Sequence, residues 1–346
     1  NNYTEAMEAF QEAERASAAE APLEFSFRIN NGIGQALTGM RQFDLAQDHL
    51  ERAQTIADAL GRPDLLSRVA IATGILSLRQ RDFPAARDAF VRGLAAIRSA
   101  SPIDPDIEGS LLHSLGRAYS EMGLLAQALE CYQASLQRLE PLGDIATMGV
   151  VHFNLGVAHE RQRSYDLARM HLEKAATLFE AQENLHLLGT VKRSLGMLLI
   201  DRGQPGEAAQ ILEQCLAIAT RTADDLGRAK TLTELARVSM LNGDLATARA
   251  EAEEAIRLAV KVQDPAEAAL AESVMASICQ REGRLDEATH RYTYALEQFE
   301  RLQMAAEVAR VSRDYAFLLL ERGEEGPAAR HFARAFRAQE SAAASR

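Results

Sequence analysis

The sequence has little of several residue types that mark common classes of protein. Its 346 residues include no tryptophan and only 5% aromatics, so small aliphatic side chains must fill most of the interior. The three cysteines, Cys131, Cys215 and Cys279, are too few and too far apart for a disulfide scaffold or a zinc ribbon. This cysteine usage is typical of a reducing compartment, and we expect a cytoplasmic protein.

Long apolar runs and an excess of positive charge are also missing. No run approaches the roughly 20 apolar residues that a membrane-spanning helix needs, so we expect no membrane partner. Thirty-eight basic residues against 49 acidic ones give a net charge of −11. This balance disfavours direct binding of nucleic acid through this region, because such binding normally needs a basic surface.

Motifs that carry catalysis are absent as well. The sequence contains no glycine-rich phosphate loop, no His-Glu-X-X-His and no Gly-X-Ser-X-Gly. His152 and His159 are seven residues apart, a spacing too wide for a shared metal ion on one helix. We therefore expect no catalytic residue, no metal site and no cofactor, and we predict that the protein is not an enzyme.

A repeat runs through the whole chain. An alanine recurs at intervals of 40 residues, with one interval of 42. The series is Ala6, Ala46, Ala86, Ala128, Ala168, Ala208, Ala248, Ala288 and Ala328. A second small residue lies twelve positions before the alanine, at Gly34, Gly74, Gly116, Gly156, Gly196, Ala236, Ala276 and Ala316. A third lies seven positions after it, as at Ala53, Ala175 and Ala255.

This spacing of small residues predicts pairs of antiparallel helices. Two small residues seven apart lie on one face of a helix, and the earlier one faces them from the preceding helix, so the two backbones can approach closely. Gly123, Gly243 and Gly283 fall at the expected turns, where glycine readily adopts the left-handed conformation that ends a helix. No stretch shows the alternation of a β-strand, so the predicted fold class is all-α.

The predicted organisation is a single solenoid over residues 1–346. We expect it to begin with a lone second helix at 3–19. Eight helix pairs follow at about 24–59, 64–99, 106–140, 146–181, 186–221, 226–261, 266–301 and 306–339. Because that lone helix lacks a partner and the chain begins with Asn1 rather than methionine, we also expect further sequence upstream.

The pattern resembles the tetratricopeptide repeat family, in a 40-residue version. The residues that carry the resemblance are the pairs Leu115-Gly116, Leu155-Gly156 and Leu195-Gly196, and the spacing from Gly243 to Ala248. The end-of-repeat proline of the family is absent. The resemblance implies a right-handed α-solenoid superhelix whose concave face, lined by the first helix of each pair, binds peptides or partner proteins.

Carried over residue by residue, the resemblance implies a set of ligand-binding residues on the first helices. They are Asn31, Gln35, Arg68, His113, Arg117, Phe153, Asn154, Arg193, Met197, Arg237 and Arg313. The arginines favour an acidic or carboxylate-terminated ligand. The alternative is that they pair with carboxylates one turn away or on the next repeat, and that the asparagines bond neighbouring helices.

Two functions remain open at this stage. The first is a non-enzymatic peptide- or protein-binding module, which resembles the repeat sensor domains of bacterial transcription regulators. Such a regulator would carry a DNA-binding segment before Asn1. The second is a structural adaptor or dimerisation scaffold. Phe332 and Phe336 lie in the last predicted repeat with no capping helix after it, so we expect a homodimer through the C-terminal repeats.

Overall fold

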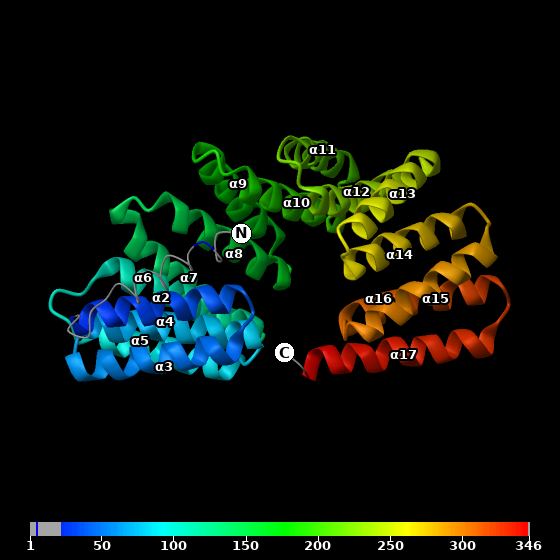
Figure 1. Ribbon diagram of the computed structural model, residues 1–346. Helices are drawn as coiled ribbons and strands as arrows, with labels where there is room; N and C mark the ends of the chain where they lie inside the picture. The colour runs from blue at the N-terminus through cyan, green and yellow to red at the C-terminus, as the bar shows by residue number, and fades with distance from the viewer. Residues whose placement is uncertain (1–4, 6–21, 345–346) are drawn as a thin grey trace. The chain divides into compact units, whose positions relative to one another are not determined.

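The computed structural model describes residue 5 and residues 22–344, and this part of the chain is helical throughout (Figure 1). It forms sixteen α-helices and one short 3-10 helix, and no strand occurs among these residues. The predicted all-α class is therefore confirmed for the described part of the chain. The helix predicted at 3–19 lies outside the described residues.

The chain divides into two compact units, Asn1–Ser164 and Tyr165–Arg346. The described helices of unit 1 are α2 (Leu23–Gly39), α3 (Phe43–Leu60), α4 (Pro63–Gln80), α5 (Phe83–Arg98), α6 (Pro105–Glu121), α7 (Leu125–Leu139), η1 (Glu140–Leu142) and α8 (Ile145–Arg161). Those of unit 2 are α9 (Tyr165–Ala181), α10 (Leu185–Asp201), α11 (Pro205–Arg221), α12 (Asp225–Leu241), α13 (Leu245–Lys261), α14 (Pro265–Arg281), α15 (Leu285–Arg301), α16 (Ala305–Glu321) and α17 (Glu325–Ala344).

Within each unit, neighbouring helices pack as pairs, and each pair packs on the next. The pairs are α2–α3, α4–α5 and α6–α7 in unit 1, and α10–α11, α12–α13, α14–α15 and α16–α17 in unit 2. The last helix departs from the prediction, because α17 continues to Ala344 rather than ending near residue 339. Alanine is the strongest helix former, and the alanines near the end of the chain extend the helix.

The turn between the two helices of a pair is built from local hydrogen bonds. Gly243 has a φ of 84°, in the left-handed region, and its amide bonds the Met240 carbonyl. The next amide, of Asp244, bonds the Ser239 carbonyl, and the Asp244 carboxylate then accepts a hydrogen bond from the Thr247 amide at 3.0 Å. One short turn thus ends α12 and caps α13.

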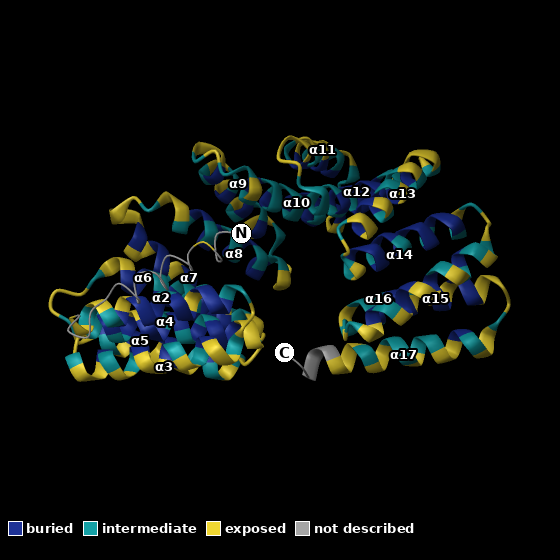
Figure 2. Ribbon diagram, viewed as in Figure 1, coloured by how far each residue is buried: buried dark blue, intermediate teal, exposed yellow. Residues whose placement is uncertain are grey.

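The small residues of the repeat lie where helices touch most closely. Ala128, Ala168, Ala208 and Ala248 are completely buried. In Figure 2 the buried residues of unit 2 lie along the faces that helices turn toward one another. A Cβ atom added to Gly116 would lie 2.6 Å from the Tyr132 ring and 3.2 Å from the Ala128 carbonyl oxygen. Only glycine fits there.

Substituting Gly116 by alanine should destabilise the protein. The added methyl group must displace a buried tyrosine ring and a helix backbone, and overpacking of this kind costs about 1–3 kcal/mol. Gly206 is the matched control, because a Cβ there would meet nothing within 4 Å, and Gly206→Ala should not destabilise. Urea unfolding followed by circular dichroism measures both changes. Equal stability of the two variants would contradict the close-approach argument.

Candidate functional site

Two positions of every first helix form two rows, four residues or one turn apart, on one helix face. Row A consists of Asn31, Ile71, His113, Phe153, Arg193, Thr233, Ser273 and Arg313. Row B consists of Gln35, Ile75, Arg117, Val157, Met197, Arg237, Ser277 and Phe317. Residues four apart on a helix lie side by side. Nine of the eleven sequence-predicted binding residues belong to these rows, and Arg68 and Asn154 lie beside them.

In unit 1 the structure brings His113 and Asn154 together. The Asn154 side-chain nitrogen lies 2.7 Å from His113 Nε2 and links α8 to α6. Burial, together with the nearby Arg117 guanidinium, lowers the pKa of His113 to about 4. The ring is therefore neutral at pH 7, and its Nε2 can accept the amide hydrogen bond. This pair follows the alternative that the sequence left open, in which Asn154 bonds a neighbouring helix.

The other predicted residues of unit 1 differ in accessibility. Gln35, Arg68 and Arg117 are exposed, and Phe153 is half-buried. Asn31 is only 9% exposed, so little of its side chain can be reached by a ligand from solvent. Accessible arginines thus remain on α4 and α6 of this unit.

In unit 2 the predicted arginines stand among carboxylates. Arg237 on α12 pairs with Glu234 one turn earlier at 2.8 Å. Arg313 on α16 approaches Asp314 at 3.8 Å, and Arg193 on α10 contacts the sulfur of Met197 at 3.7 Å. Partly exposed pairs of this kind contribute about 0–1 kcal/mol. A ligand carboxylate can therefore displace the internal partner of Arg237 or Arg313.

Sequence reasoning missed two carboxylates on this face. Asp314 is buried enough to raise its pKa, against the opposing effect of Arg310, Arg313 and Arg237. Arg310 approaches Asp314 at 3.7 Å and donates to the Ser273 hydroxyl at 3.1 Å, which joins α16 to α14. The available signal was the Arg-X-X-Arg-Asp run from 310 to 314, which places three charges within one turn of α16.

Glu267, the second missed carboxylate, is 4% exposed and lies between α14 and α12. Its Oε1 is 2.6 Å from Thr233 Oγ1, which is also 3.1 Å from the Ala229 carbonyl oxygen. The threonine hydroxyl has one proton and can donate to only one of these oxygens, so a protonated carboxyl satisfies the arrangement best. Burial raises the pKa of Glu267 to about 7, although Thr233 and Lys230 oppose the shift.

Two arginines near the predicted binding surface hold neighbouring first helices together. Arg161 donates to the Ser120 carbonyl at 2.9 Å, and Arg281 donates to the Met240 carbonyl at 2.8 Å. Both bonds span 41 residues and join the last turns of two first helices. Carbonyl groups at a helix C-terminus lack intrahelical partners and carry partial negative charge, so a cation there is stabilising. These two arginines belong to the repeat stack.

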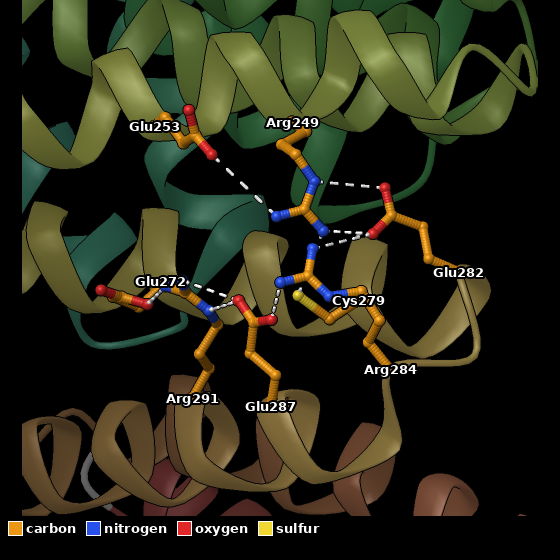
Figure 3. Close-up of polar contacts among 8 residues, drawn as sticks. All are labelled: Arg249, Glu253, Glu272, Cys279, Glu282, Arg284, Glu287 and Arg291. Carbon is orange, nitrogen blue, oxygen red and sulfur yellow. Dashed lines mark hydrogen bonds and ion pairs between the residues drawn. The ribbon is translucent and has the colours of Figure 1, made fainter.

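A larger polar cluster joins α13, α14 and α15 (Figure 3). Arg249 pairs with Glu282, and Glu282 also approaches Arg284 at 3.4 Å. Glu287 contacts Arg284 and also Arg291 at 3.0 Å. The chain of contacts ends where Arg291 meets Glu272 at 2.5 Å. Because each charge has a partner of opposite sign, this cluster fastens one repeat to the next rather than presenting a charge to a ligand.

The described residues offer little for metal binding or thiol chemistry. No group of three histidine, cysteine or acidic side chains among them could hold a metal ion. Cys215 and Cys279 are buried, and burial raises the pKa of both thiols, which disfavours the reactive thiolate. In the described part of the chain, no helix is both long and apolar enough to cross a membrane.

The family is decided by comparison with known repeats. The tetratricopeptide repeat family model matches three overlapping stretches, residues 107–181, 144–221 and 187–261. The repeats at residues 107–261 are therefore tetratricopeptide repeats. The family predicted from the Leu-Gly pairs is thus confirmed. A search among curated proteins found no match.

Solved structures with this fold include several Rap proteins. The apo form of RapI is 14% identical, with a TM-score of 0.77 and coverage of 98% of this chain and 96% of RapI. Aspartyl phosphate phosphatase F from Bacillus subtilis is 12% identical, with a TM-score of 0.72 over 98% and 92% of the two chains. The Rap conjugation gene regulator of plasmid pLS20, solved with the Phr* peptide, is 14% identical, with a TM-score of 0.64 over 98% and 95%. At these identities the likeness shows the tetratricopeptide repeat fold.

Glu267 should make the stability of the protein depend on pH. Because its pKa is raised from 4.5 to about 7 on folding, the native state binds the proton more tightly than the unfolded state does. The contribution of Glu267 to the free energy of unfolding should be largest below pH 4.5. This contribution should fall by up to ~1.4 kcal/mol per pH unit as the pH rises toward 7.

Urea unfolding between pH 4.5 and 8 measures this effect, with wild type and Glu267→Gln compared. The glutamine keeps the hydrogen bond to Thr233 without titrating, so the difference between the two proteins should change over this range. Glu297→Gln, at an exposed position on α15, is the matched control and should follow wild type. Parallel pH profiles for wild type and Glu267→Gln would contradict the assignment.

Proposed function

We propose that the protein is a non-enzymatic module that binds an extended, acidic or carboxylate-terminated peptide segment along the part of rows A and B that lies on the first helices of unit 2. The observation that carries the proposal is the placement of Arg193, Arg237 and Arg313 on one face of α10, α12 and α16. Their guanidinium groups can bind carboxylates through two hydrogen bonds. The protein has a net charge of −11, so an acidic segment is favoured only where these guanidinium groups bind its carboxylates.

The structural neighbours support the same reading. One of them, the pLS20 Rap regulator, is described in complex with a peptide, and it has the same fold over 98% of this chain. We therefore extend the proposal to a ligand-sensing role in a bacterial regulator, in which peptide binding changes the packing of the helix pairs. Three free cysteines fit a cytoplasmic setting for such a sensor.

Peptide selection followed by mutation tests this function. A random phage-displayed peptide library is selected on the purified protein, and the enriched peptide is synthesised with a fluorescent label. Its affinity should fall about tenfold or more on Arg237→Ala, because a charge-assisted hydrogen bond contributes about 1.5–3 kcal/mol. Fluorescence anisotropy at fixed ionic strength measures the change.

The control variant is Arg301→Ala, which removes an exposed arginine from the second helix α15 of the same unit. It changes the net charge equally and should leave the affinity unchanged. Selected peptides that lack acidic residues, or that lose equal affinity in both variants, would contradict the proposed binding face.

The second candidate, a dimerisation scaffold, is favoured by the C-terminal helix pair. Phe317 is 52% exposed and Phe336 is 63% exposed, while Phe332 contacts Phe317 edge to face at 5.3 Å. In the preceding repeat, Leu296 occupies the position of Phe336 and is 1% exposed. Exposed aromatic side chains at such a position favour self-association through α16 and α17.

Light scattering at tens of micromolar protein tests this second candidate. A dimer mass is expected for wild type, and Phe336→Glu should yield a monomer because it places a charge within the apolar contact. Glu340→Gln, at an exposed position one turn further along α17, serves as a control and should remain dimeric. A monomeric mass for wild type would rule out the homodimer.

A further inference from the structure

Two cavities occur at the same position of the repeat, one in each unit. Each is lined by two consecutive second helices and the first helix between them. The first, of about 500 Å³, involves α3, α4 and α5, and the second, of about 490 Å³, involves α15, α16 and α17. Arg92 and Ala96 line the first cavity as Arg334 and Ala338 line the second.

Both cavities are lined by an alanine at the same position of a second helix. In the intervening repeats the same position carries larger side chains, namely Arg138, Leu178, Ile218, Leu258 and Gln298. Each alanine is therefore a position at which a larger side chain would narrow the cavity.

The two cavities differ in charge. One arginine, Arg92, and one glutamate, Glu51, line the cavity in unit 1. The cavity in unit 2 is lined by Arg330, Arg334 and Arg337 of α17 against the single carboxylate of Glu300. Three arginines against one glutamate leave two uncompensated positive charges.

The contacts in the unit 2 cavity show which charges are available. Arg334 donates to Glu300 Oε1 from Nε at 3.0 Å and approaches the same oxygen with Nη2 at 2.5 Å. Among the described residues, no ion pair engages Arg330 or Arg337. Nδ1 of His331 is buried without a hydrogen-bond partner in this part of the chain, and burial beside Arg334 and Arg330 lowers the pKa of the ring.

We propose that this cavity binds a small molecule that carries a phosphate monoester on an apolar body. A phosphate monoester is close to a dianion at pH 7 and matches the two uncompensated charges, which Arg330 and Arg337 supply as planar donors. Val308 and Ala338 provide apolar wall for the rest of the molecule. A volume of about 490 Å³ lies within the range typical of small-molecule sites. The site is separate from rows A and B, and the inference does not rest on the peptide-binding proposal.

Titration calorimetry of the full chain with phenyl phosphate at 0.15 M salt tests the proposal. We expect binding to one site, weakened by Ala338→Leu, which narrows the cavity with the side chain that Leu178 and Leu258 already place at this position. Ala96→Leu, which narrows the equivalent cavity of unit 1, is the matched control and should bind as wild type does. Both variants keep every charge of the protein.

Three further variants and two further probes make each outcome decisive. Arg330→Gln and Arg337→Gln should each weaken binding of phenyl phosphate roughly tenfold, while Arg92→Gln should not. The three arginine variants also serve as the test if Ala338→Leu disturbs the helical circular dichroism signal. Absence of binding at millimolar phenyl phosphate, or binding that Ala338→Leu leaves intact, would overturn the proposal. Equal affinity for benzoate would refute a dianion site, and equal affinity for inorganic phosphate would refute the apolar part.

Discussion

Close approach between the two helices of a pair is the constraint on which the rest of the structure depends. At Gly116 the Tyr132 ring and the Ala128 carbonyl occupy the space that any larger residue would need. The same register recurs every 40 residues, with one interval of 42, and so the same packing is built again along each unit. Because a small residue, glycine or alanine, recurs at this position, side chains on the first helices form rows whose spacing is set by the backbone rather than by loops.

This constraint also explains how function can vary on a fixed scaffold. Positions that face a neighbouring helix are restricted to small or matching apolar residues, whereas positions turned away from it are not. Row B can therefore carry Arg117, Met197, Arg237 and Phe317 on equivalent turns. Likewise, Ala338 lies between two second helices and lines a cavity. Different side chains can thus be carried at the unconstrained positions.

Much of the fold could be predicted from the sequence, and less of the site. The series of small residues predicted an all-α repeat protein, because close approach of two paired helices is a local requirement that recurs along the chain. Glu267 was not predicted, since its burial depends on Thr233 one repeat away. The sequence left two roles for Asn154, and only the packing of α8 on α6 places it on His113. In the same way, Glu234 beside Arg237 reduces the free positive charge that the arginine series alone suggested.

We propose that the first-helix face of unit 2 is the binding surface of this protein. A crystal structure with a selected acidic peptide tests that claim most directly. The account predicts extended peptide density across α10, α12 and α16, with peptide carboxylates within hydrogen-bond distance of Arg193, Arg237 or Arg313. Peptide density confined to the second helices, with these arginines still bound to their internal partners, would contradict it.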